Sequence, residues 1–127
     1  MQEKHLFEYA VIRVVPKVER EEFLNVGVVL YCAKHKFLQV MYELDEKRLH
    51  SFSPDLDISE INEYLQAFER ICKGGKEAGA IGKLSVAERF RWLTATRSTV
   101  VQTSKVHTGL AENSPDMLKR LYEQLVK

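Results

Sequence analysis

The first third of the chain holds three segments rich in β-branched and aromatic residues, and their close succession constrains the fold more than any other feature. The segments are residues 6–15, 23–32 and 37–44. Such side chains fit the pleated, half-buried surface of a sheet. A four-residue polar turn joins the last two segments, which predicts a hairpin. Because strands that follow one another through short connections pair antiparallel, the sequence predicts a three-stranded antiparallel meander.

Polar residues and a glycine interrupt two of these predicted strands. The two-residue period of a strand puts Arg13 on an otherwise apolar face near the end of the first one. Asn25 and Gly27 lie two residues apart in the second, so we expect them on one face. A glycine inside a strand often marks a bulge or the close approach of another backbone or a ligand, and the alternative is that it provides space for a neighbouring aromatic side chain or helix. Arg13 and Asn25 are therefore candidate ligand-binding residues.

The remainder of the chain is mostly helical in pattern. Helices are predicted over residues 45–52, 57–73 and 85–93 and from residue 114 to the C-terminal end. The last three each begin with a residue able to cap a helix, namely Asp57, Ser85 and Ser114. Residues 89–92 also alternate like a strand, but the cap at Ser85 favours a helix. These helices present apolar stripes that can cover a sheet.

The connecting segments complete the predicted fold. Four glycines in residues 74–82 indicate a mobile linker, which can also serve as a lid beside a site. Residues 98–104 predict one later strand, and residues 106–113 a loop. We expect a single domain over residues 1–127 of the α+β class. Its core would be a small antiparallel sheet of about four strands, a three-stranded meander plus one later strand, covered by helices on one face.

Composition limits the classes of function. Nineteen basic and eighteen acidic residues leave a net charge of +1, so binding of nucleic acid is not excluded but would need a local basic patch. Cys32 and Cys72 lie too far apart for a zinc or redox motif, and we expect buried free thiols. The N-terminal residues lack the apolar core of a secretory signal and the longest apolar run is too short to span a membrane, so we expect a cytoplasmic protein.

Residues 89–110 carry four basic side chains, seven hydroxyl groups and no acidic residue. Fixed positive charge beside short hydroxyl donors suits the binding of an anion such as phosphate or carboxylate. The alternative is that the arginines are solvated or pair internally with Glu22 and Glu88. The candidate ligand-binding residues are Arg89, Arg91, Arg97, Ser98, Thr99, Gln102 and His107, joined from the sheet by Arg13 and Asn25.

Three interpretations of function remain open. The first is a binding or interaction module whose anionic ligand is a nucleotide, a nucleic-acid backbone or an acidic segment of a protein partner. The second is an enzyme of phosphoryl chemistry with His107 as a weak catalytic candidate, because the pKa of histidine lies near neutrality. The sequence has no metal-ligand, phosphate-loop or nucleophile motif, so we expect no metal and no cofactor. The third is an accessory subunit whose apolar surface meets another chain, with a face formed by Tyr31, Tyr42, Trp92 and the hydroxyl-rich strand predicted over residues 98–104. The oligomeric state stays open.

Two groups of residues resemble a known family. One is Tyr9…Arg13-x-x-Pro16 followed by Glu22-x-x-Asn25-Val26-Gly27-Val28. The other is Glu88-Arg89-Phe90…Arg97-Ser98-Thr99-Val100-Val101-Gln102…Ser104-x-Val106-His107-x-Gly109. In order and spacing they resemble the bacterial family called domain of unknown function 3037. The resemblance covers nearly the whole chain and implies a compact, standalone bacterial protein with no assigned activity. It also hints at a kinase-fold protein of the HipA-like type as a partner.

Overall fold

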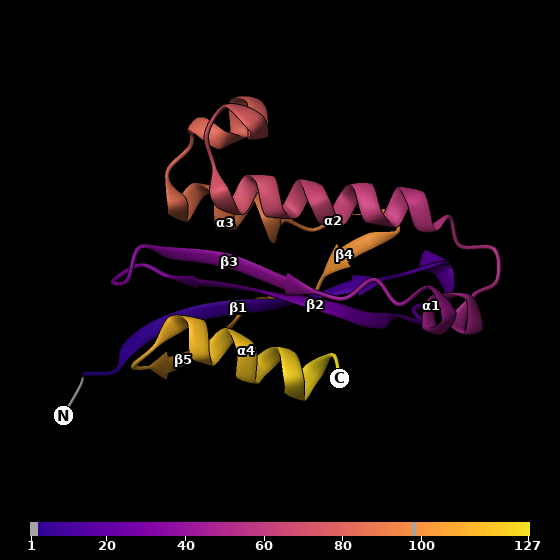
Figure 1. The fold of residues 1–127 in the computed structure, drawn as a ribbon, viewed down its shortest axis with the longest axis horizontal. Helices are drawn as coiled ribbons and strands as arrows, with labels where there is room; N and C mark the ends of the chain where they lie inside the picture. The colour runs from indigo at the N-terminus through magenta and orange to yellow at the C-terminus, as the bar shows by residue number, and fades with distance from the viewer. Residues whose placement is uncertain (1–2, 98) are drawn as a thin grey trace.

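The computed structural model describes residues 3–97 and 99–127, apart from the side chain of Val18. Its centre is a five-stranded antiparallel sheet (Figure 1). The strands are β1 (His5–Val14), β2 (Leu24–Cys32), β3 (Phe37–Tyr42), β4 (Val101–Thr103) and β5 (His107–Ala111). The order is β3-β2-β1, and both β4 and β5 pair with the other edge of β1. The predicted meander and the α+β class are confirmed, while the sheet has one strand more than expected.

The extra strand is β5, in a region predicted to be a loop. Ser104 joins β4 to β5 by donating its amide to Val11 O (2.8 Å) and accepting the Val11 amide on its hydroxyl (2.9 Å). The two short strands therefore act as one interrupted partner of β1. Gly109, within the predicted loop, lies in β5 opposite Phe7, and a β-carbon there would be 2.6 Å from the Phe7 ring. The glycine provides room for an aromatic side chain rather than a turn.

A β-bulge changes the expected faces of β2. Ile12 pairs with Gly27 and Arg13 pairs with Asn25, which leaves Val26 as the extra residue. Asn25 consequently points to one face of the sheet, where its side chain donates to Leu125 O. Gly27 lies on the other face of the sheet. Tyr42, the residue of β3 that pairs with Gly27, points to that same face. The expectation that Asn25 and Gly27 share a face is therefore wrong, because a bulge inverts the alternation beyond it.

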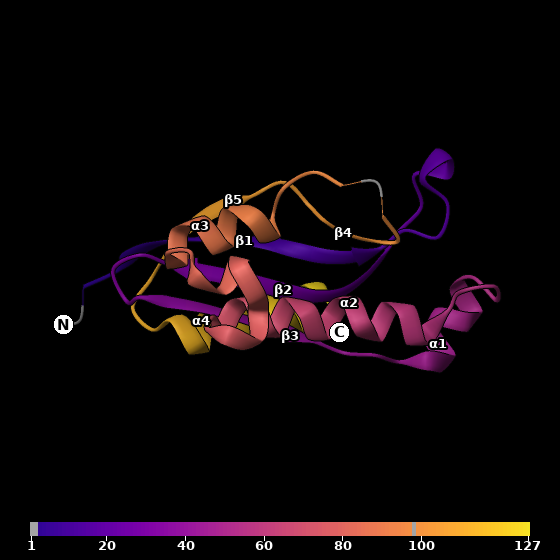
Figure 2. The ribbon, with the colours of Figure 1, turned by 90° about the horizontal axis from the view of Figure 1, so that it is seen from above.

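Helices cover both faces of the sheet rather than one (Figures 1 and 2). They are α1 (Glu46–Phe52), α2 (Ile58–Lys73), α3 (Val86–Leu93) and α4 (Ser114–Leu125), with 3-10 segments η1 (Val18–Arg20) and η2 (Lys76–Lys83). We call the side of α2 and α3 the α2 face and the side of α4 the α4 face. The reason for two covered faces is β2, whose nearly continuous apolar run is buried on both sides.

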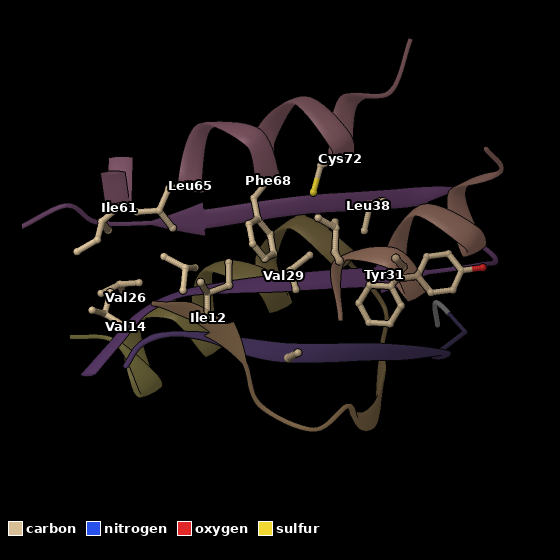
Figure 3. Close-up of a cluster of buried hydrophobic side chains, with 14 of the residues drawn as sticks. Ile12, Val14, Val26, Val29, Tyr31, Leu38, Ile61, Leu65, Phe68 and Cys72 are labelled. Atoms are coloured by element: carbon tan, nitrogen blue, oxygen red, sulfur yellow. The ribbon is translucent and has the colours of Figure 1, made fainter. Parts of the chain in front are cut away.

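Each face of β2 packs against a separate cluster of apolar side chains. On the α2 face, Val29 packs with Leu65 and Phe68 of α2, whose side chains point down onto the sheet in Figure 3. On the α4 face, Leu30 packs with Leu118 and other residues of α4. Burying large aliphatic and aromatic side chains stabilises a fold by about 1.5–3 kcal/mol each relative to exposure. The two clusters therefore hold the sheet rigidly between its helices.

Two predicted helix caps are confirmed, while the cap of α4 and the glycine-rich segment differ from the predictions. Asp57 caps α2 and Ser85 forms the predicted capping box with Glu88. Asn113, not Ser114, caps α4 by accepting the amide of Asp116. Residues 74–82, predicted as a linker, fold largely into η2, and Gly75 donates to Gly82 O at 3.0 Å.

Two further expectations concern the cysteines and membranes. Cys32 and Cys72 are both buried free thiols, as predicted. Among the described residues, no helix is long and apolar enough to cross a membrane.

Candidate functional site

Arg89, the first of the candidate arginines, is 8% exposed and is directed at the C-terminal end of α2. Its Nη1 donates to Ile71 O and Cys72 O, each at 2.7 Å, and its Nε donates to Leu84 O at 3.2 Å. A helix leaves its last carbonyls without partners inside the helix, and a cation there also complements the helix dipole. Arg89 therefore joins α2 to α3 through backbone carbonyls.

Arg91 and Arg97 use their guanidinium groups elsewhere. Arg91 pairs with the Glu8 carboxylate at 2.9 Å, which ties α3 to β1. Arg97 donates to Leu93 O (3.2 Å) and to Trp92 O (2.5 Å) at the end of α3. The structure does not bring the three candidate arginines to one point.

The hydroxyl and amide candidates before β4 make local contacts. Ser98 lies outside the described residues. Thr99 donates its hydroxyl to Val101 O at 2.7 Å, and Gln102 donates its amide to Thr99 O at 2.8 Å. These bonds shape the chain as it enters β4.

Three of the candidates do lie together, in a row across the α4 face. Arg13 pairs with Asn25 of β2 on one side and with Gln102 of β4 on the other. Directly opposed residues in an antiparallel sheet have β-carbons about 5 Å apart. The Arg13 guanidinium also lies over the Phe23 ring, at 3.9 Å from its centroid. We call Asn25, Arg13 and Gln102 the polar row.

His107, the weak catalytic candidate, is half-buried on the same face of the sheet. It pairs with Tyr9 and its ring stacks on that ring at 5.2 Å between centroids. Val11 separates this pair from Arg13 along β1. Within residues 3–97 and 99–127, no group of acidic, histidine and cysteine side chains has the arrangement of a metal site.

The aromatic residues of the accessory-subunit interpretation do not form one surface. Tyr31 is 9% exposed and stacks on Phe90 inside the protein. The Tyr42 hydroxyl donates to the Glu69 carboxylate of α2. Trp92, on α3, is the exposed member at 46%.

A groove that the sequence did not reveal runs beside β3 and has a volume of about 520 Å³. We call it the β3 groove. Its lining comes from the start of β3, the end of α2 and from α3: Lys36, Phe37, Leu38, Gln39, Val40, Glu69, Cys72, Lys73, Val86 and Arg89. Of these, Arg89 alone was a sequence candidate. The lysines belong to a turn and a helix end, where basic residues are ordinary, so no sequence signal marked them.

The edge of β3 that borders the groove has no strand beside it in the described part of the chain. Glu43 donates its amide to Val26 O, so this residue faces β2. Because backbone groups alternate sides along a strand, Leu38 and Val40 direct their amides and carbonyls away from β2. The groove thus lies next to unpaired main-chain donors and acceptors.

Positive charge dominates the lining of the β3 groove. Lys36 and Lys73 are exposed, and the nearly buried Arg89 adds a third cation. Glu69 is the one acidic residue of the lining, and its carboxylate accepts the Tyr42 hydroxyl. Burial, together with this hydrogen bond and the Glu69 charge, raises the pKa of Tyr42 to about 12. Tyr42 is therefore a neutral donor at pH 7.

The Cys72 thiol also borders the β3 groove. Burial raises its pKa to about 12, although the nearby Arg89 charge acts in the opposite direction. A thiol that keeps its proton is a poor nucleophile and a poor metal ligand. Cys72 therefore contributes an apolar surface to the groove.

Comparison with known proteins adds one finding. A family model described as "Protein of unknown function (DUF3037)" matches residues 9–126, nearly the whole chain. No curated protein and no solved structure matches the chain.

Proposed function

Because the chain belongs to the DUF3037 family of proteins of unknown function, its geometry is the guide to its role, and we propose that it is a non-enzymatic interaction module. In this proposal the β3 groove binds an extended, acidic segment of a partner polypeptide. The observation that carries the proposal is the coincidence of the β3 groove, the unpaired edge of β3 and an excess of positive charge.

The unpaired edge of β3 supplies the affinity in this proposal. An exposed strand edge is a template for another strand, and peptide-binding domains use it to add a strand from a ligand. Leu38 and Val40 would exchange main-chain hydrogen bonds with the added segment. β3 has six residues, and because an added strand rises by the same distance of about 3.3 Å per residue, a segment of about six residues spans it.

The charges of the groove supply the specificity. The exposed side chains of Lys36 and Lys73 can move towards a carboxylate on the ligand. Arg89 keeps its hydrogen bonds to α2 and attracts the ligand electrostatically from a distance. A basic segment would meet three cations of the same sign. In this proposal Arg89 takes part in anion binding, as the basic residues of segment 89–110 suggested. It does so through long-range electrostatic attraction rather than direct contact.

The nature of the partner follows from the ligand chemistry. The groove suits a protein with an exposed acidic strand or tail. A kinase-fold protein of the HipA-like type is one candidate for this partner. The competing interpretation, phosphoryl chemistry at His107, has less support because the ring stacks on Tyr9 and, among the described residues, accepts no hydrogen bond from a second catalytic group.

The proposal is tested with two synthetic hexapeptides, one alternating valine with glutamate and one alternating valine with lysine. Fluorescence anisotropy should show binding of the acidic peptide and little binding of the basic one. Charge reversal of Lys36 and Lys73 together should weaken binding of the acidic peptide about tenfold, since an exposed ion pair contributes up to about 1 kcal/mol. Lys34→Glu, in the same turn but outside the groove lining, is the matched control. Equal binding of both peptides would contradict the proposal.

A second variant pair tests strand addition itself. Val40→Pro removes an amide that faces the free edge, which an edge strand tolerates, and should abolish peptide binding while circular dichroism stays native. Val40→Ala keeps the amide and shortens the side chain, so it should bind. If Val40→Pro folds and still binds normally, the peptide does not pair with β3.

A further inference from the structure

The polar row on the α4 face is an unusual feature in an otherwise apolar part of the sheet. Its central member, Arg13, is flanked along β1 by the buried Val11. Its neighbours Asn25 and Gln102 come from the adjacent strands on either side. Arg13 is half-buried as a residue, but its Nε is buried, and a buried N–H of a charged group normally has a carboxylate or carbonyl partner.

Two atoms of this row are buried without a partner. Among the described residues, Arg13 Nε and Asn25 Oδ1 are the buried side-chain atoms that make no hydrogen bond. One is a charged donor and the other a neutral acceptor. A buried polar atom without a partner costs about 1–3 kcal/mol, and more when it is charged. Two such atoms on directly opposed residues call for an explanation.

Neighbouring contacts fix the orientation of both groups. Asn25 donates its amide nitrogen to Leu125 O at 3.1 Å, so the amide oxygen is the end left free. A flipped amide would oppose two oxygens. Phe23 covers a face of the Arg13 guanidinium, at 3.9 Å from Cζ to the ring centroid. Because guanidinium donors lie in its plane, the stacked ring takes up none of its N–H groups.

No carboxylate of the described residues neutralises Arg13. Glu22, the nearest acidic residue in sequence to Phe23, pairs instead with Arg20 at 2.5 Å. The other ion pair joins Arg91 to Glu8. The positive charge of Arg13 is therefore left to attract an anion.

From these contacts we propose that the polar row binds a small oxyanion that carries a hydroxyl or N–H donor. The anionic oxygens would accept from Arg13 Nε and its neighbouring guanidinium N–H groups. The donor of the ligand would satisfy Asn25 Oδ1. This site lies across the sheet from α2 and is independent of the β3 groove.

The dimensions of the row limit the ligand. Asn25 and Gln102 flank Arg13 at about 5 Å each, as directly opposed residues of a sheet do. Because Arg13 Nε and Asn25 Oδ1 belong to directly opposed residues, the ligand that bridges them must be small, such as a single carboxylate or phosphate group with a short polar extension. Gln102 already donates its amide nitrogen to Thr99 O, so the contacts proposed for the ligand are those with Arg13 and Asn25.

Paired probes test the proposal on the whole chain by NMR. Glycolate and acetate share a carboxylate and differ in one hydroxyl donor, while inorganic phosphate tests the other oxyanion. Titration should shift the Arg13 Nε–Hε resonance, and glycolate should bind more tightly than acetate by about fivefold, as expected for one neutral hydrogen bond of about 1 kcal/mol. Whether phosphate or glycolate binds more tightly distinguishes the two anion classes.

Variants separate the two contacts. Asn25→Ala should bring glycolate down to the affinity of acetate, and Arg13→Met should abolish the response to all three anions. Arg91→Met, which removes an exposed arginine from α3, is the matched control and should leave binding unchanged. Should Arg13→Met unfold the protein, the titration of the unmodified chain still decides.

Two outcomes would overturn the proposal. One is an Arg13 Nε–Hε resonance that none of the three anions shifts, which would mean that Arg13 and Asn25 satisfy each other in solution. The other is an equal response to the anions in the Arg13→Met variant, which would place binding elsewhere. Binding of the acidic peptide to the β3 groove should be unaffected by Arg13→Met, so the two sites fail or succeed separately.

Discussion

A β-carbon on Gly74 would lie 2.7 Å from Nη1 of Arg89, so the glycine after α2 is the space into which the arginine fits. Gly74 has a φ of 76° and a ψ of −174°, a backbone conformation that is essentially confined to glycine. Arg89 uses this space to reach the carbonyls of Ile71 and Cys72. The relationship connects the end of α2, the start of α3 and the lining of the β3 groove.

Gly74→Ala should destabilise the protein more than Gly75→Ala. Both glycines have a positive φ and almost the same conformation, but nothing lies within 4 Å of a β-carbon on Gly75. Strain costs each variant about 1–3 kcal/mol. The loss of hydrogen bonds to the charged Arg89 should add about 1.5–3 kcal/mol in Gly74→Ala alone. Urea unfolding gives the difference, and equal free energies of unfolding would show that Arg89 is not held by this contact.

Ser104→Ala should cost about 1–3 kcal/mol, because it leaves the buried Val11 amide without an acceptor between β4 and β5. Hydrogen exchange at Val11 should accelerate even under conditions where the rest of β1 stays protected. The matched control is Ser51→Ala on exposed α1, which should change the free energy of unfolding by less than about 0.5 kcal/mol. A protected Val11 amide in Ser104→Ala would mean that another acceptor replaces the hydroxyl.

Gly109→Ala should cost about 1–3 kcal/mol by overpacking against the Phe7 ring. Phe7→Leu shortens that side chain, so the double variant should be more stable than the sum of the two single changes predicts. Thermal or urea unfolding of the four proteins measures the coupling. Additive changes would indicate that Phe7 moves aside without cost.

These positions also show what the sequence could and could not predict. The meander, the α2 stripe and the caps at Asp57 and Ser85 are local patterns, and the structure confirms them. The loop predicted over residues 106–113 is wrong because the role of Gly109 depends on Phe7, which is about a hundred residues away in sequence. The prediction that helices cover one face missed α4 on the second face, because a continuous apolar strand does not specify which helix covers each of its faces.

In the candidate site, too, the residues could be predicted locally but their meeting could not. Arg13, Asn25 and Gln102 were sequence candidates, yet their alignment depends on a bulge at Val26 and on the pairing of β4 with β1, which no local pattern specifies. The β3 groove depends on β3 being an edge strand, which is a property of the whole sheet. Sequence reasoning therefore identified polar side chains in unusual places, and the tertiary fold decides which of them meet.

The hydrogen bond between Tyr42 and Glu69 predicts how the protein responds to alkaline pH. The pKa of Tyr42 is raised to about 12 in the folded state, against about 10 for an unperturbed tyrosine. Between these values the folded chain keeps a proton that the unfolded chain has lost, so the stabilisation is complete below about pH 10 and declines as the pH rises towards 12. Tyr42→Phe should remove this part of the decline, which urea unfolding at several alkaline pH values measures.

Glu69→Gln provides the complementary test. It removes the charge that raises the pKa but leaves the burial that is the largest cause, so the pKa of Tyr42 should fall while staying above its ordinary value. Ultraviolet titration of tyrosinate, with Tyr42→Phe subtracted to isolate one phenol, gives that pKa directly. The same substitution removes the one acidic residue of the β3 groove lining and should strengthen binding of the acidic hexapeptide. If the pKa of Tyr42 stays at about 12 in Glu69→Gln, burial alone would account for its shift.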